Sequence, residues 1–218
     1  MIAAERLFLS REDLADELAR DVADSLRKSI AANGAAALAV SGGTTPKLFF
    51  SNLAQRKLEW WKVTVTLVDE RQVPEKSERS NARLVKNSLI KHGALAARFI
   101  PLYGNPAASS VPRFTAVILG MGSDGHTASF FPGGDTLAEA TNPKTKKRIV
   151  AISAPGSGEP RLTFTLPVLL DTDFLALHIE GREKRKVLDA ALADGPMEAM
   201  PIRAILRSEK PVTLYWCP

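Results

Sequence analysis

The chain has little chemistry of the kind that holds metals or disulfides. Its 218 residues include one cysteine, Cys217, and three histidines. One thiol cannot form a disulfide within the chain, and no Cys/His group has the spacing of metal ligands. No apolar run approaches the roughly 20 residues that cross a bilayer, and the N-terminus shows no apolar stretch typical of a signal peptide. We therefore expect a cytoplasmic protein that binds no metal and does not contact a membrane.

The excess of positive charge is also small. The 29 Lys and Arg against 24 Asp and Glu give a net charge of +5. The two basic runs, residues 144–148 and 182–186, contain no aromatic side chain, which argues against a nucleic-acid partner. Apolar and charged fractions of 45% and 24% are typical of a globular protein. We expect one domain over residues 1–218, with a mild positive field that would attract a small anionic molecule.

Helical and strand patterns alternate along the chain. Residues 11–32 carry Leu, Val or Ile every four positions, which predicts a long helix with Ser10 as its N-cap and Gly34 as its stop. Short apolar runs predict buried strands at residues 35–40, 63–68, 116–119, 149–153, 174–179 and 212–216. Further helices are expected at about 81–91 and around 188–192. This alternation predicts a Rossmann-like α/β fold, with one mostly parallel sheet and helices on both faces.

Three unusual segments each follow a predicted strand directly: residues 41–46, 69–71 and 120–127. Parallel strands end at the same edge of a sheet, and ligands of open α/β sheets bind beyond that edge. The three segments are therefore expected to converge on one site, although they are far apart in sequence.

The first segment has the composition of an anion-binding loop. Ser41, Gly42, Gly43, Thr44 and Thr45 combine glycines, which allow close approach of the backbone, with hydroxyl groups ahead of a helix. It lacks the Gly-Lys-Ser/Thr ending of a Walker A loop. A tight turn with a helix cap is the alternative interpretation.

Charged side chains supply the other candidate contacts. In the second segment, Asp69 or its neighbour would handle a proton or orient another group, and Arg71 would bind an anionic or carbonyl oxygen. An ion-pair cluster that closes the strand is the structural alternative. Arg161 and Lys184 are placed to bind a phosphate, although a lysine in a first helical turn is often simply solvated.

The third segment contains Gly-x-Gly-x-x-Gly at residues 120–125, but a dinucleotide site is not favoured. That fingerprint normally lies in the first strand–helix unit and is followed by an acidic residue at the next strand end. His126 instead lies among small residues, where an imidazole takes a proton from water near neutral pH. Asp124 and Asp69 are candidates to orient it. His92 is expected to cap the end of the 81–91 helix, and His178 to be a satisfied core histidine.

Together these segments resemble the signature blocks of the 6-phosphogluconolactonase family, the lactone hydrolases of the pentose phosphate pathway. The blocks are Ser-Gly-Gly-Thr-Thr-Pro at 41–46, Val-Asp-Glu-Arg-Gln-Val-Pro at 68–74 and Gly-Met-Gly-Ser-Asp-Gly-His-Thr-Ala-Ser at 120–129. Ser80-Asn81 and residues 161–170 extend the likeness over essentially the whole chain.

The resemblance implies a phosphorylated sugar lactone as substrate, no cofactor, and His126 as the base that activates water. It also implies that Asp69 and Arg71 line the sugar site, and that Ser41 to Thr45, Arg161 and Lys184 hold the phosphate. Backbone N–H groups of a glycine-rich loop would hold the oxyanion. Glu159 departs from the Lys-Pro sequence common in that loop of the family, which puts contacts from residues 156–160 in question.

Two other functions remain open at this point. The family shares its fold with the glucosamine-6-phosphate deaminases, in which Asn-Glu typically stands where this chain has Phe130-Phe131. The missing carboxylate favours lactone hydrolysis over amine release. A non-catalytic sugar-phosphate sensor is the third possibility, and the presence of His126 and Asp69 argues against it. We expect a monomer.

Overall fold

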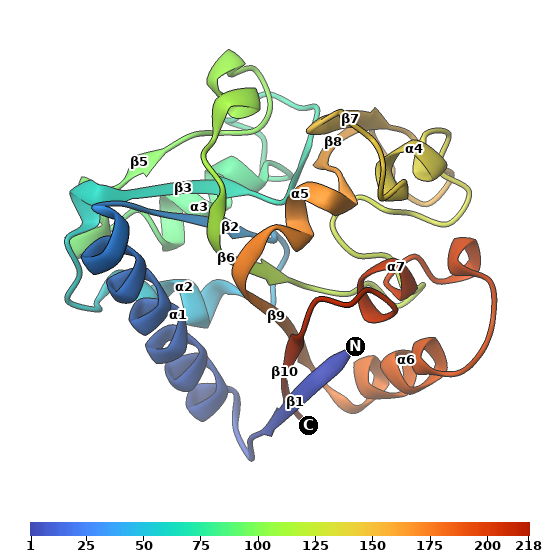
Figure 1. Cartoon of the computed structure of the whole chain (residues 1–218), viewed down its shortest axis with the longest axis horizontal. Coiled ribbons are helices and arrows are strands. Elements are labelled where there is room, and N and C mark those ends of the chain that lie inside the picture. Colours follow the sequence, from blue (N-terminus) through green and yellow to red (C-terminus); the bar gives the residue numbers. More distant parts are fainter.

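The main sheet has seven strands, and every neighbouring pair in it is parallel. The computed structural model describes residues 1–218 (Figure 1). The strand order is β1-β10-β9-β6-β2-β3-β5. Its members are β1 (Ile2–Leu7), β2 (Ala36–Val40), β3 (Val63–Leu67), β5 (Arg98–Phe99), β6 (Phe114–Leu119), β9 (Thr172–Glu180) and β10 (Val212–Cys217). The predicted mostly parallel sheet is confirmed.

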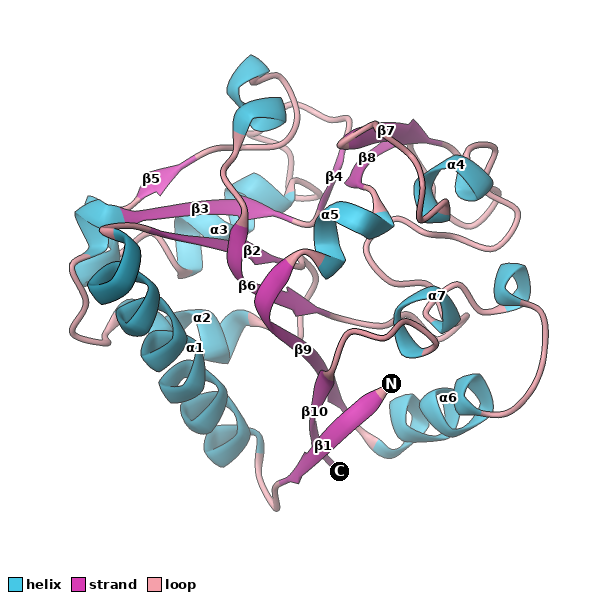
Figure 2. Ribbon diagram, viewed as in Figure 1, coloured by secondary structure: helices cyan, strands magenta, loops and turns pink.

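Helices cover both faces of this sheet (Figure 2). They are α1 (Arg11–Asn33), α2 (Lys47–Ala54), α3 (Asn81–Ser88), α4 (Leu137–Thr141), α5 (Leu166–Leu170), α6 (Arg182–Leu192) and α7 (Arg203–Leu206), with short 3₁₀ turns at Trp60–Lys62, His92–Ala96, Pro106–Ser110 and Met197–Ala199. Successive residues of β10 show the two faces. Tyr215 donates its hydroxyl to Asp21 of α1, whereas Arg185 of α6 lies over the ring of Trp216. No helix is both long and apolar enough to cross a bilayer.

The ends of α1 are those expected from the sequence. The Ser10 hydroxyl accepts a hydrogen bond from the amide of Asp13 at 3.1 Å. Gly34 adopts φ 78° and donates its amide to the carbonyl of Ile30. A side chain would be strained in that left-handed conformation, which is why glycine ends the helix there.

A second, antiparallel sheet corrects the single-sheet expectation. It consists of β4 (Asp69–Arg71), β8 (Arg161–Phe164) and β7 (Ile149–Ile152), in the order β4-β8-β7. Residues 149–153 were expected in the main sheet, and this was wrong because they form β7, which pairs with β8. Residues 69–71 follow β3 directly, as expected, but they form a strand of their own because β4 pairs with β8.

Two further elements differ from the expectation. The edge strand β1 was not predicted, because it pairs only with β10 and three of its residues in succession are exposed. Helix α3 ends at Ser88, so His92 does not cap it. Leu89 occupies the cap position, and His92 has φ 50° at the start of the next 3₁₀ turn, where Gly93 packs against Trp60.

Candidate active site

A pocket of about 290 Å³ lies at the carboxyl ends of β2, β6 and β9. Its lining includes the residues after β2, the residues after β6 and the last residues of β9. All ten candidate site residues line it: Ser41, Gly42, Gly43, Thr44, Thr45, Asp69, Arg71, His126, Arg161 and Lys184. The three segments therefore converge as the parallel topology predicts.

The loop from Ser41 to Thr45 presents free backbone donors. The amide of Ser41 donates to the carbonyl of Ile118, and its hydroxyl accepts from the amide of Gly120 at 3.0 Å. These two bonds tie the loop to the glycine-rich segment. The amides of residues 42–45 donate to no other group of the protein. They lie directly ahead of α2, and such groups at a helix start favour a bound anion.

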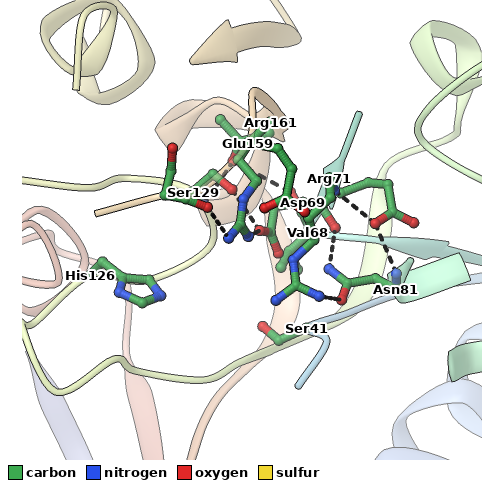
Figure 3. A network of polar contacts seen from close by, with 12 residues as sticks. Ser41, Val68, Asp69, Arg71, Asn81, His126, Ser129, Glu159 and Arg161 are labelled. Carbon is green, nitrogen blue, oxygen red and sulfur yellow. Dashed lines mark hydrogen bonds and ion pairs between the residues drawn. The ribbon is translucent and has the colours of Figure 1, made fainter. Parts of the chain in front are cut away.

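Asn81 is a pocket residue that the candidate set omitted. Its Nδ2 donates to the carbonyl of Asp69, and its Oδ1 accepts from Nη1 of Arg71, both at 3.0 Å (Figure 3). A Cβ atom on Gly42 would overlap this amide, so the backbone of the first loop passes directly against it. The only sequence signal was the Ser80-Asn81 match, because the contact joins residues about 40 positions apart.

Glu70 has a structural role beneath the pocket. Its carboxylate is 2% exposed and accepts from the amides of Asn81 and Ala82, the amide of Arg71 and the hydroxyl of Ser80. Burial raises the pKa of this carboxyl, and the four hydrogen bonds oppose that rise. Glu70 thus anchors the first turn of α3 and, with it, Asn81.

Asp69 points into the pocket beside a buried guanidinium. Its Oδ2 accepts from the Ser129 hydroxyl at 2.6 Å and lies 3.7 Å from Nη1 of Arg161. Arg161 is 8% exposed, donates Nη2 to the carbonyl of Ser157, and has no partner for Nε. Desolvation lowers the pKa of Arg161, and the charge of Asp69 opposes this. An unpaired N–H on a buried cation is costly unless an anion enters the pocket.

His126 is held in the turn of the glycine-rich segment. Its carbonyl accepts from the amide of Gly122, and Gly125 takes φ 76° to close the turn. The side chain is 29% exposed, and its Nδ1 lies 2.6 Å from Oδ1 of Asp124. Nε2 is therefore the ring nitrogen left for chemistry.

The carboxylate that faces His126 is Asp124. Desolvation acts to raise the pKa of Asp124, but hydrogen bonds from the ring and the amide of His126 outweigh it and bring the pKa to about 2. Asp69, the other candidate orienting group, makes no hydrogen bond to His126, and Figure 3 shows the two side chains apart. Of the two candidates, Asp124 is therefore the group that orients the ring, whereas Oδ2 of Asp69 contacts Ser129 and Arg161 instead.

Lys184 turns inward from the first turn of α6. Its Nζ donates to the carbonyl of Met121 at 2.7 Å. Desolvation lowers the pKa of Lys184, and the negative charge of Asp124 opposes that change. The alternative of a freely solvated lysine therefore does not hold.

Two further residues singled out in the sequence, His178 and Glu159, are held by contacts within the protein. His178 borders the pocket from β9 but is 3% exposed, with Nε2 3.1 Å from Oε1 of Glu180, so the expected buried and hydrogen-bonded histidine is confirmed. Glu159 accepts from Nη2 of Arg79, and its loop does not line the pocket. No three His, Cys, Asp or Glu side chains form a group that could hold a metal ion.

Comparison with known proteins identifies the family. Residues 9–216 match the family model described as glucosamine-6-phosphate isomerases/6-phosphogluconolactonase. The chain belongs to this family. It is 50% identical to a 6-phosphogluconolactonase of Rhizobium meliloti, over 100% of both chains.

Solved structures of the family agree with the fold. A 6-phosphogluconolactonase from Shewanella baltica matches with a TM-score of 0.94 at 34% identity, over 99% of this chain and 97% of that one. A monomeric glucosamine-6-phosphate deaminase matches with a TM-score of 0.77 at 19% identity, over 98% and 97%. The second likeness shows a shared fold alone, so the activity must be argued from the site.

Proposed function

We propose that this protein hydrolyses 6-phospho-D-glucono-1,5-lactone to 6-phosphogluconate in the oxidative pentose phosphate pathway. The observation that carries the proposal is the position of His126. One of its ring nitrogens is tied to Asp124, and the ring lines a pocket that also holds three cationic side chains, Arg71, Arg161 and Lys184. The full-length likeness to proteins named 6-phosphogluconolactonase supports the same substrate.

His126 acts as the base that activates water. Its Nδ1–H donates to Asp124, which fixes the tautomer and leaves Nε2 as the proton acceptor. Nε2 takes a proton from water while the water oxygen forms a bond to the lactone carbonyl carbon. The bond from that carbon to the ring oxygen then breaks, and the proton on Nε2 passes to the ring oxygen. Asp124 stays ionised throughout and stabilises the transient imidazolium.

The negative charge that develops on the carbonyl oxygen needs donors that are already in place. In the segment around His126, the amides of Gly120, Gly122 and His126 already donate within the protein. Met121 and Ala128 also line the pocket, and their amides donate to no other group of the protein, so they are the backbone N–H groups left for the oxyanion. Preorganised donors of this kind typically contribute about 10²–10³ in rate each. A lactone is an activated ester, so a positioned water, a base and these donors suffice for the reaction.

The phosphate of the substrate is bound by Arg161, Lys184 and the free backbone amides of residues 42–45. The N–H groups of residues 42–45 donate to no other group of the protein, and Arg161 has an unpaired Nε, so a bound anion would accept hydrogen bonds from both. Lys184 adds a third contact from α6. Asp69 and Arg71 line the part of the pocket assigned to the sugar hydroxyls and carbonyl.

The deaminase and sensor alternatives receive no support from the site. Both residue 130 and residue 131 are phenylalanines, which have no carboxylate, and neither lines the pocket. A sensor would need no general base, yet His126 is oriented by a dedicated hydrogen bond. The cytoplasmic location and the monomeric state remain predictions.

The test uses lactone generated in situ by oxidation of glucose 6-phosphate, with its disappearance measured against spontaneous hydrolysis. The proposal expects the protein to accelerate the reaction well above the buffer rate. If the rate equals that of buffer alone, the proposal is wrong, and ammonia release from glucosamine 6-phosphate would establish the deaminase alternative.

A further inference from the structure

Phe131 is buried outside the continuous hydrophobic core, and it contacts two residues that line the pocket without lining it itself. It is 3% exposed, yet it is not among the 58 side chains of the continuous core cluster. Its neighbour Phe130 is fully buried and belongs to that cluster. An aromatic ring that is buried outside the hydrophobic core must be covered by polar or charged side chains.

Those neighbours are the base and a buried cation of the pocket. The rings of Phe131 and His126 are stacked, with centroids 4.2 Å apart and planes 29° apart. The guanidinium carbon of Arg161 lies 5.1 Å from the centroid of the same phenyl ring. One side chain that neither donates nor accepts a proton therefore contacts both groups.

The stack supplies a constraint on His126 that its hydrogen bond does not. The contact from Nδ1 to Asp124 fixes one point of the imidazole but leaves the ring free to swing about that contact. A flat aromatic face at stacking distance restricts the swing, because tilting the imidazole would drive it into the phenyl ring. The direction of Nε2 is then set by two independent contacts.

The contact with Arg161 leaves that cation available to a ligand. A phenyl face attracts a guanidinium through its quadrupole without occupying any N–H group. Arg161 keeps an unpaired Nε and is 8% exposed, so it is held in position while a donor stays free for an anion.

We propose that Phe131 is a positioning residue that orients the His126 imidazole and the Arg161 guanidinium for the lactone substrate. The inference rests on the proposed function, since it assigns His126 the role of base. Removal of the Phe131 ring should lower kcat, because His126 is less well oriented, and should raise KM, because Arg161 is less well positioned. Misplacement of a catalytic group by about 1 Å typically costs on the order of 10²-fold in rate.

The first test is independent of turnover. The chain has three histidines, so proton NMR shows three imidazole Cε1–H signals, and His126→Ala identifies one of them. Ring current from the stacked phenyl shifts the His126 signal upfield. Phe131→Leu, which keeps the apolar bulk, should move that signal downfield and leave those of His92 and His178 in place. An unmoved His126 signal would overturn the proposal.

The second test measures kinetics in a double-mutant cycle. Phe131→Leu should lower kcat at least tenfold, and this loss should disappear when it is introduced into His126→Ala. Phe131→Tyr, which keeps the ring, should retain the upfield signal and most of kcat. An equal loss of kcat in both backgrounds would show a merely structural role and contradict the proposal.

Phe130→Leu is the matched control. This substitution also replaces a phenyl ring by leucine, but in the hydrophobic core. It should therefore lower the melting temperature without moving the His126 signal. If Phe131→Leu fails to fold, Phe131→Met serves in both tests with the same expected results. A wild-type protein without lactonase activity would refute the proposed function alone, and the NMR signal would still decide whether Phe131 orients the ring.

Discussion

The imidazole of His126 lies so close over the backbone of Gly122 that a Cβ atom there would overlap Nδ1 and Cε1 of the ring. The same Cβ would lie 2.5 Å from Oδ1 of Asp124. Gly122 is therefore required for close approach, because the hydrogen-bonded pair of His126 and Asp124 occupies the space of a side chain.

Gly122→Ala should displace the imidazole and lower kcat by about 10²-fold, since a shift of about 1 Å costs that much in a positioned catalytic group. The displaced pair lies partly in solvent, so the melting temperature should change little. Steady-state kinetics and a thermal scan measure the two effects. Gly156→Ala is the control, because nothing lies within 4 Å of its added Cβ atom. Full activity in Gly122→Ala would contradict the tight packing of the ring.

Gly42→Ala should weaken substrate binding through Asn81. The added Cβ would push the Asn81 amide away, and Arg71 would lose its hydrogen bond to Oδ1. A hydrogen bond to a charged group contributes about 1.5–3 kcal/mol, so KM should rise roughly tenfold or more. In the double variant with Asn81→Ala the clash is absent, and the two effects should not add. Additive effects on KM would show that Gly42 acts by another route.

Asp124→Asn should change how stability depends on pH. The pKa of Asp124 is about 2 in the folded protein, against an ordinary value of 3.8. The folded carboxyl binds its proton less tightly than the unfolded one, so its contribution to stability is complete above 3.8 and is lost as the pH falls toward 2. The difference in free energy of unfolding between the wild type and Asp124→Asn should therefore shrink on acidification.

Urea unfolding of both proteins at about pH 6 and at about pH 3 measures this difference in free energy of unfolding at two pH values. A difference that stays constant between the two pH values would mean that the pairing with His126 does not depress the pKa of Asp124.

The parts of the fold that the sequence predicts are those with strong local patterns. Helix α1 shows its apolar stripe, its serine cap and its terminal glycine, and β2 and β6 are continuous apolar runs. The strands β1 and β4 lack such patterns. β1 is half exposed at the edge of the sheet, and β4 is three polar residues that are extended only because β8 pairs with them.

The site was predictable where its residues follow strand ends, because parallel topology brings those ends together. The contacts that complete it were not. Asn81 reaches Gly42 across about 40 residues, and Phe131 contacts Arg161 across 30, so neither contact leaves a local pattern. His126 pairs with Asp124 rather than with Asp69, and the sequence does not show why. Oδ2 of Asp69 contacts Ser129 and Arg161, which are distant in sequence.

The most direct measurement of the central claim is turnover and product binding by the single variant His126→Ala. General-base catalysis is worth about 10²–10⁴-fold, so kcat for 6-phosphogluconolactone should fall by that factor or more. Calorimetric affinity for 6-phosphogluconate should stay near that of the wild type, because the free amides and Arg161 are untouched. Wild-type turnover in His126→Ala would contradict the account.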